Sequence, residues 1–198
     1  RSKMQSGEYQ TAIDALLSIK ESDVNSVQIK LLLIDSYEKS GSINKAILVA
    51  KELIEQFPND SYYRQRMGSL YGLNGQLAFA RQAFEEALQL DNQNIAAIIH
   101  LGRMDIIAGE TSKAIAFLEA KLKEFKQNPL IMAEISDAYL IAGDIENSLV
   151  WINKAQAQTP NDFYILSKQV RALEANNKLS AAVETVDLFI GQNSKQIE

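Results

Sequence analysis

Apolar residues recur every three or four positions along most of the chain, the spacing that places them on one face of an α-helix. Within residues 61–74, Met67 and Tyr71 follow this spacing, and Gly75 comes directly afterwards as a helix stop. A second run with the same spacing begins at Leu77 and is followed by polar turn residues. The pattern predicts an all-α chain in which short helices alternate with short turns.

The turns recur at a fixed interval of 34 residues. Five of the nine glycines stand in this register, and the next place holds Asn, which also tolerates the left-handed backbone that ends many helices. A small residue follows five positions after each turn, as expected where two helices approach closely. The two series are Gly7, Gly41, Gly75, Gly109, Gly143 and Asn177, and Ala12, Ala46, Ala80, Ala114, Ser148 and Ala182.

This interval predicts five complete helix pairs and part of a sixth. An amphipathic helix pair cannot bury its apolar faces alone, so we expect residues 1–198 to form a single array, an α-solenoid of antiparallel pairs with about 11 helices. Residues 1–26 are expected to supply only the turn at Gly7 and the second helix of an earlier repeat. The predicted full repeats are residues 27–60, 61–94, 95–128, 129–162 and 163–196.

With these features the sequence resembles the tetratricopeptide repeat (TPR) family, and the resemblance covers essentially the whole chain. The family unit is 34 residues long, with small, aromatic and Pro residues at set places. Departures occur at Asp105 and Leu173, where Tyr is usual, and at Lys121 and Phe189, where Ala is usual. The resemblance implies a right-handed superhelix and a bacterial-type array. Matching residues are Tyr37, Ala46 and Pro58; Gly68, Tyr71, Ala80, Phe84 and Ala87; Gly102 and Ala114; and Tyr139, Ala155 and Pro160.

Composition and charge narrow the function further. The chain has 46% hydrophobic and 23% charged residues, typical of a globular protein. Its net charge of −5 argues against nucleic acid as a partner, because phosphate-binding surfaces are basic. No apolar run approaches the length of a membrane span. The sequence leaves the compartment open, whether periplasmic, envelope-associated or cytoplasmic.

Candidate chemistry is sparse in this sequence. It has no Cys and a single histidine, His100, so neither a cysteine nucleophile nor a two-histidine metal site can be assembled. We expect no enzyme activity, no cofactor and no metal. The glycines around Gly68 and Gly72 resemble a phosphate loop only superficially, and close helix packing explains them better.

Recognition of a protein or peptide segment is therefore the predicted function. The family register places the first helix of each repeat along a concave groove, and it also puts Tyr164, Lys168, Arg171 and Glu174 there. Arg66, His100 and Arg103 are expected to form a basic centre, with Glu134 and Asp137 acidic beyond it. The apolar members either contact the ligand or pack between helices. The predicted groove residues are Tyr62, Gln65, Arg66, Ser69, Ile99, His100, Arg103, Ile106, Glu134, Asp137 and Leu140.

The groove does not match the carboxylate clamp with which some family members hold chaperone tails, because Leu31 and Asp35 occupy places that need Lys and Asn. Replacing Arg66 and Arg103 with Glu is expected to weaken binding of an acidic partner without unfolding the array. The resemblance implies a scaffold in a bacterial envelope, export or exopolysaccharide system. The alternative is the substrate-recognition arm of a larger enzyme, such as a glycosyltransferase or peptidase.

The two ends of the sequence suggest a segment of a longer array. The chain opens at Arg1, and the apolar helix around residues 179–191 is not followed by a polar capping helix. We expect the native protein to continue in both directions. The alternative is self-association through these uncapped terminal helices.

Overall fold

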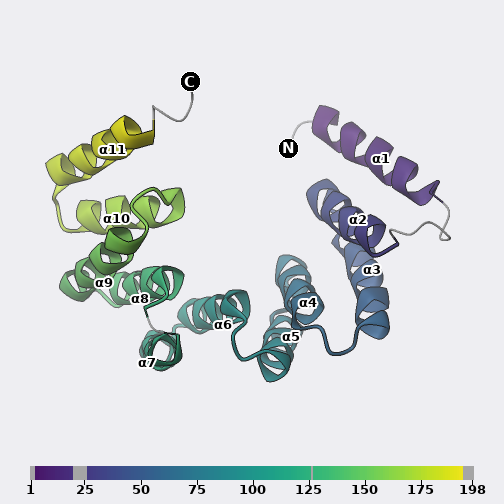
Figure 1. Cartoon of the computed structure of the whole chain (residues 1–198), viewed down its shortest axis with the longest axis horizontal. Coiled ribbons are helices and arrows are strands. Elements are labelled where there is room, and N and C mark those ends of the chain that lie inside the picture. The colour runs from purple at the N-terminus through teal and green to yellow at the C-terminus, as the bar shows by residue number, and fades with distance from the viewer. Residues whose placement is uncertain (1–2, 20–25, 126, 194–198) are drawn as a thin grey trace. The chain divides into compact units, whose positions relative to one another are not determined.

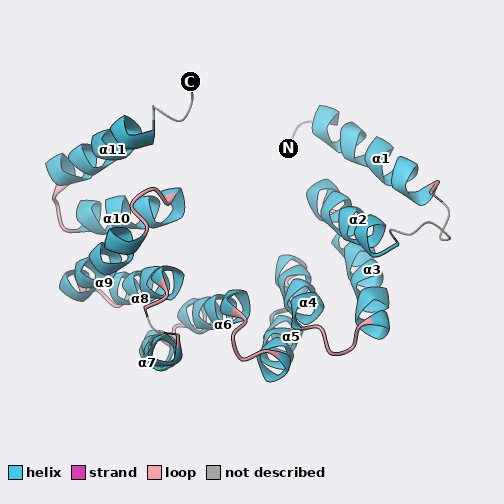
Figure 2. Cartoon of the chain, in the orientation of Figure 1, coloured by secondary structure: helices cyan, strands magenta, loops and turns pink. Residues whose placement is uncertain are grey.

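The computed structural model describes residues 3–19, 26–125 and 127–193, which form eleven α-helices and no strand (Figures 1 and 2). The predicted all-α fold is confirmed. The helices are α1 (Lys3–Leu17), α2 (Ser26–Ser40), α3 (Ile43–Gln56), α4 (Ser61–Leu73), α5 (Leu77–Leu90), α6 (Ile95–Ile107), α7 (Thr111–Glu124), α8 (Pro129–Ile141), α9 (Ile145–Gln158), α10 (Phe163–Ala175) and α11 (Leu179–Asn193).

The chain divides into two compact parts, an N-terminal half (residues 1–97) and a C-terminal half (residues 98–198). In the N-terminal half α2 packs on α3 and α4 packs on α5, and in the C-terminal half α8 packs on α9 and α10 on α11. Each of these pairs lies inside one predicted repeat. Each half is therefore a stretch of α-solenoid built from stacked helix pairs.

Most first helices of the repeats begin with a side-chain cap that has the same 34-residue period. A cap oxygen accepts a hydrogen bond from a backbone N–H in the first turn of the helix, which satisfies a donor that would otherwise have no partner. These four contacts run from Tyr62 N to Asp60 at 2.9 Å, from Ala97 N to Asn94 at 3.0 Å, from Leu130 N to Asn128 at 2.9 Å and from Tyr164 N to Asp162 at 2.8 Å.

The turn after each first helix is closed by a residue with positive φ. Gly41, Gly75, Gly109 and Gly143 have φ between 75° and 82°, and Asn177 has φ 54°. These are the predicted turn residues, and their role is confirmed. The small residues of the second register, from Ala46 to Ala182, are all buried.

The first member of each register departs from the prediction. Gly7 lies inside α1, which runs without a turn from Lys3 to Leu17, and Ala12 is exposed. The expected turn at Gly7 is therefore wrong. Residues 1–2 and 20–25 of the predicted partial repeat lie outside the described residues.

Asn177 provides a test of the turn register. Asn177→Ala is expected to lower the free energy of unfolding by about 1 kcal/mol, because a Cβ in the left-handed region is strained and Ala lacks the local hydrogen bonding of Asn. Asn177→Gly should leave stability unchanged or raise it slightly. Urea unfolding followed by circular dichroism measures both. Equal stability of the two variants would contradict the assigned backbone conformation.

Candidate functional site

The predicted groove residues lie on three first helices, in two different halves. Tyr62, Gln65, Arg66 and Ser69 are on α4 in the N-terminal half. The other seven are on α6 and α8 in the C-terminal half: Ile99, His100, Arg103, Ile106, Glu134, Asp137 and Leu140. A single groove that includes residues of both halves stays a prediction.

In the N-terminal half, Arg66 bridges two first helices. Its guanidinium lies 2.7 Å from an oxygen of Asp35 and 3.1 Å from one of Glu38, both on α2. Gln65 donates to the Ser69 hydroxyl at 3.0 Å, and Tyr62 is 49% exposed. Arg66 is thus already neutralised by carboxylates of its own chain.

In the C-terminal half, the charged groups converge on Glu134 of α8. Its carboxylate is 1% exposed and accepts two hydrogen bonds from the Arg103 guanidinium on α6, at 2.8 and 2.7 Å. The Tyr164 hydroxyl on α10 donates to the same carboxylate, and the Lys168 ammonium lies 3.3 Å from it. A buried carboxylate needs such partners, since an unpaired one costs several kcal/mol.

The network continues to Asp137, one turn further along α8. The Lys168 ammonium, 9% exposed, forms an ion pair with Asp137 Oδ2 and lies 4.7 Å from the centre of the Tyr164 ring. Arg171 Nη1 lies 3.7 Å from Asp137 Oδ1. Three consecutive first helices, α6, α8 and α10, are therefore joined by five charged side chains and one tyrosine: Arg103, Glu134, Asp137, Lys168, Arg171 and Tyr164.

The surroundings of each group fix its charge. Burial alone raises the pKa of Glu134, yet the hydrogen bond from Arg103 and the charge of Lys168 hold that pKa below its usual range. Burial alone lowers the pKa of Lys168, yet the charges of Glu134 and Asp137 raise it. Burial and the neighbouring Arg103 lower the pKa of His100, against the opposing charge of Glu134, so this imidazole is mostly neutral at pH 7.

The charged groups of the network differ in their exposure to solvent. Glu134 and Lys168 are buried, at 1% and 9% side-chain exposure, and Asp137 is mostly covered at 15%, whereas Arg103 is 40% and Arg171 is 56% exposed. The sequence predicted a basic centre with a separate acidic patch beyond it. In the structure Arg103, Glu134 and Asp137 belong to one network whose solvent-facing groups are guanidinium groups.

Three members of the network, Tyr164, Lys168 and Arg171, were placed on this face by register but were not among the predicted groove residues. A signal for them exists in the sequence. Arg66 pairs with Asp35, Arg103 with Glu134, and Lys168 with Asp137, each across 31 residues. This separation is one repeat less about one helical turn, so the two residues of each pair meet on adjacent first helices.

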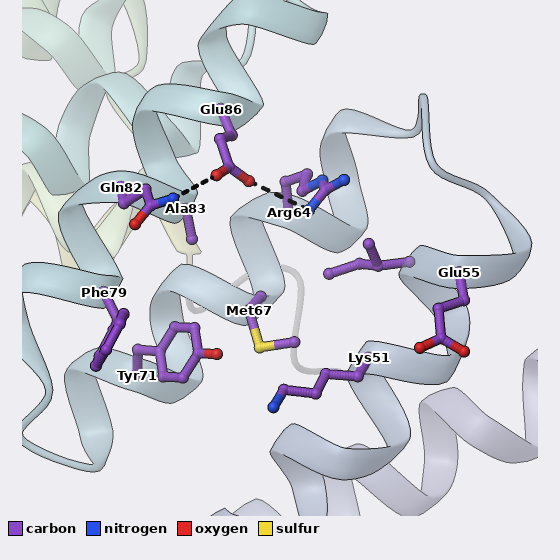
Figure 3. A pocket seen from close by; sticks show the side chains of 10 residues that line it. Lys51, Glu55, Arg64, Met67, Tyr71, Phe79, Gln82, Ala83 and Glu86 are labelled. Atoms are coloured by element: carbon purple, nitrogen blue, oxygen red, sulfur yellow. Dashed lines mark hydrogen bonds and ion pairs between the residues drawn. The ribbon is translucent and has the colours of Figure 1, made fainter.

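A second site, missed by sequence reasoning, is a pocket of about 330 Å³ in the N-terminal half (Figure 3). Helices α3, α4 and α5 line it. Met67, Tyr71 and Phe79 give it an apolar wall, and the Tyr71 and Phe79 ring centres are 5.5 Å apart. Glu86 accepts from Arg64 at 3.2 Å and from Gln82 at 2.9 Å. Phe79 is 55% exposed.

Among the described residues there is no cluster of three or more His, Cys, Asp or Glu side chains that could hold a metal ion. No helix in the described part of the chain is long and apolar enough to cross a membrane. Both sites present what protein recognition uses, namely exposed cations beside buried anions and an apolar hollow with a charged rim.

The fold and these surfaces are those of a helical repeat protein of the class that binds other proteins. The sequence profile of the tetratricopeptide repeat family matches residues 7–186, and the chain belongs to that family. Tetratricopeptide repeat proteins are protein-binding scaffolds, and the family match supports this general role for the chain.

Lipopolysaccharide assembly protein B of Escherichia coli K12 is 22% identical over 201 residues, which cover 97% of this chain and 52% of that protein. The chain thus spans about half the length of these curated relatives. Among solved structures, the type IV pilus biogenesis factor PilW has a TM-score of 0.68 at 19% identity, covering 95% of this chain and 87% of PilW. A thermophilic TPR protein of Thermus thermophilus has a TM-score of 0.66 at 22% identity, covering 85% of this chain and 91% of its own.

Proposed function

We propose that the C-terminal half binds an acidic segment of a partner protein, as an extended peptide or an amphipathic helix, across α6, α8 and α10. One observation carries this proposal: the network buries its carboxylates and leaves the Arg103 and Arg171 guanidinium groups facing solvent. A guanidinium binds a carboxylate through paired, charge-assisted hydrogen bonds. An acidic residue of the partner therefore finds donors already held in place.

Rigidity of the donors supports the same proposal. Arg103 is fixed by Glu134 and stands over the Tyr164 ring, with its guanidinium 5.8 Å from the ring centre. Arg171 is anchored more loosely, at 3.7 Å from Asp137. A preorganised side chain loses little conformational entropy on binding, which improves affinity. The negatively charged Glu174, one turn after Arg171, limits the basic surface on that side.

The partner belongs, in this proposal, to a bacterial envelope, export or exopolysaccharide assembly system. The support is the likeness of the chain to Escherichia coli lipopolysaccharide assembly protein B over 97% of its length. The proposal predicts that the protein acts by bringing partners together, without catalysis of its own.

Arg171→Glu tests this function. We expect it to weaken binding of the partner about tenfold or more, because it replaces an attraction with a repulsion at an exposed site. The partner is first identified by affinity capture from the native organism, and its acidic segment is then titrated in a fluorescence anisotropy assay. Arg171 is the better choice than Arg103, whose loss also disturbs a buried carboxylate.

Lys154→Glu is the matched control for this experiment. It makes the same charge change on the second helix α9, where Lys154 is exposed and stands over the Trp151 ring. We expect wild-type affinity for this variant, and a salt dependence of binding that is reduced only in Arg171→Glu. Equal losses in both variants would indicate a general charge effect and contradict the proposed site.

A further inference from the structure

Two exposed isoleucines extend the charged face of the C-terminal half by one helical turn. Ile107 follows Arg103 by four residues on α6, and Ile141 follows Asp137 by four residues on α8, so each pair shares one helix face. Ile107 is 77% exposed and Ile141 is 50% exposed. Both isoleucines lie on helices that have further described helices before and after them.

These side chains belong to two parallel rows that cross α6, α8 and α10. Successive members of each row are 34 residues apart, so both rows follow the repeat. On every helix the second row lies four residues after the first, a rise of about 6 Å. The charged row consists of Arg103, Asp137 and Arg171, and the apolar row consists of Ile107, Ile141 and Ala175.

Charge decides which side chains of a partner each row accepts. The exposed guanidinium groups of Arg103 and Arg171 attract carboxylates to the charged row. Glu174 is exposed beside Ala175 and repels carboxylates from the apolar row. A complementary partner therefore has acidic side chains along one edge and apolar side chains along the other.

An extended chain meets this requirement better than a helix. Successive side chains of an extended segment point to opposite sides, and those on one side recur about every 6.6 Å. Between two rows about 6 Å apart, such a segment directs every second side chain to each row. A helix is about 10–12 Å across and turns one face to both rows together.

We propose that the acidic segment of the partner lies extended between the two rows, with acidic residues at every second position toward Arg103 and Arg171. The apolar residues between them contact Ile107 and Ile141. This inference rests on the function proposed above, and it selects the extended peptide over the amphipathic helix. Binding then depends on the order of the residues, because a shift of one position exchanges the two edges.

Two synthetic peptides of identical composition test this order. In the first, Glu and Leu alternate over about eight residues, an extended length of roughly 26 Å that crosses three helices about 8–10 Å apart. In the second, the same residues form one block of Glu and one block of Leu. Each peptide is labelled with fluorescein and titrated with the chain in an anisotropy assay. The alternating peptide should bind about tenfold more tightly, because only it reaches both rows along its length.

A variant that combines Ile107→Ser and Ile141→Ser removes the large side chains of the apolar row. It should bind the alternating peptide about tenfold more weakly, because both contacts lose their apolar area. Its unfolding in urea should match that of the wild type, since both side chains are exposed. Val150→Ser is the control: Val150 is 48% exposed on the second helix α9, and its variant should keep wild-type affinity.

Arg171→Glu separates this inference from the function on which it rests. It should weaken both peptides, whereas the isoleucine variant should weaken the alternating peptide alone. Equal affinities of the two peptides, both lowered by Arg171→Glu, would overturn the extended arrangement and leave the acidic partner standing. A loss in Val150→Ser as large as that in the isoleucine variant would also overturn the arrangement. If neither peptide bound, or if Arg171→Glu changed neither affinity, both proposals would be overturned.

Discussion

Arg103→Met is expected to lower the free energy of unfolding by about 3 kcal/mol at neutral pH, because it removes two hydrogen bonds from a carboxylate that is 1% exposed. Removing one partner of a buried ion pair typically costs about 3–5 kcal/mol. The lower end applies here, since Tyr164 and Lys168 still contact Glu134. Urea unfolding monitored by circular dichroism measures the change.

The effect of Arg103→Met should depend on pH in a defined direction. The folded-state pKa of Glu134 is lowered, so its contribution to stability is present above the unfolded-state pKa of about 4.3 and is lost as the pH falls through the lower folded-state value. In the variant, burial raises the pKa of Glu134 with less opposition. The stability difference between wild type and variant should therefore be largest near pH 7 and shrink below about pH 4.

Arg64→Met is the control for this pair of measurements. Arg64 lies 3.2 Å from Glu86, but that carboxylate is 35% exposed, so water replaces the lost partner. We expect a cost of about 1 kcal/mol or less. If Arg103→Met were no more destabilising than Arg64→Met, the assignment of Glu134 as a buried, paired carboxylate would be contradicted. Arg103→Glu is expected to cost more stability than Arg103→Met, since that change sets two carboxylates side by side.

Gly68→Val should destabilise the N-terminal half by about 2 kcal/mol, whereas Gly72→Val in the same helix should change stability by about 0.5 kcal/mol or less. A Cβ added at Gly68 would lie 2.7 Å from two ring atoms of Phe84, a residue that is 3% exposed and cannot move freely. A Cβ at Gly72 meets nothing within 4 Å. Close packing therefore explains Gly68, as the sequence predicted, but it does not explain Gly72.

The cause of the Gly68 effect can be isolated with Phe84→Ala. If the ring is what the valine strikes, the double variant should lose clearly less stability than the sum of the two single variants. Additive losses would show that the backbone of α4, and not its contact with Phe84, demands glycine. Thermal or urea unfolding of the wild type, the two single variants and the double variant gives the four free energies that this double-mutant cycle needs.

The positions of the 34-residue period show best how much of the fold can be predicted from the sequence. Gly75 and Asn177 could be assigned as helix-ending turns because few other residues accept positive φ at low cost, and Ala80 and Ala114 as packing positions because only a short side chain fits there. These are local requirements, and a residue type reveals them directly. The prediction at Gly7 was wrong, because Gly7 lies inside α1 and glycine does not by itself end a helix.

The charged surface could be predicted only in part. Register placed Arg103, Glu134 and Asp137 on one face, but sequence alone did not show that the carboxylates are buried and the guanidinium groups exposed. That depends on how α6, α8 and α10 pack, because the same carboxylate is a surface charge or a buried ligand according to its neighbours. The pocket at Phe79 was missed for a related reason, since its wall comes from three helices of two repeats.

The sequence by itself determined the all-helical fold, the turns from Gly41 to Asn177 and the interval at which they repeat, since each depends on contacts between residues that are near in the chain. The tertiary structure decided which charges face water and where apolar side chains leave a hollow. Both follow from the packing of residues about one repeat apart, as in the pairing of Arg103 with Glu134 across 31 residues.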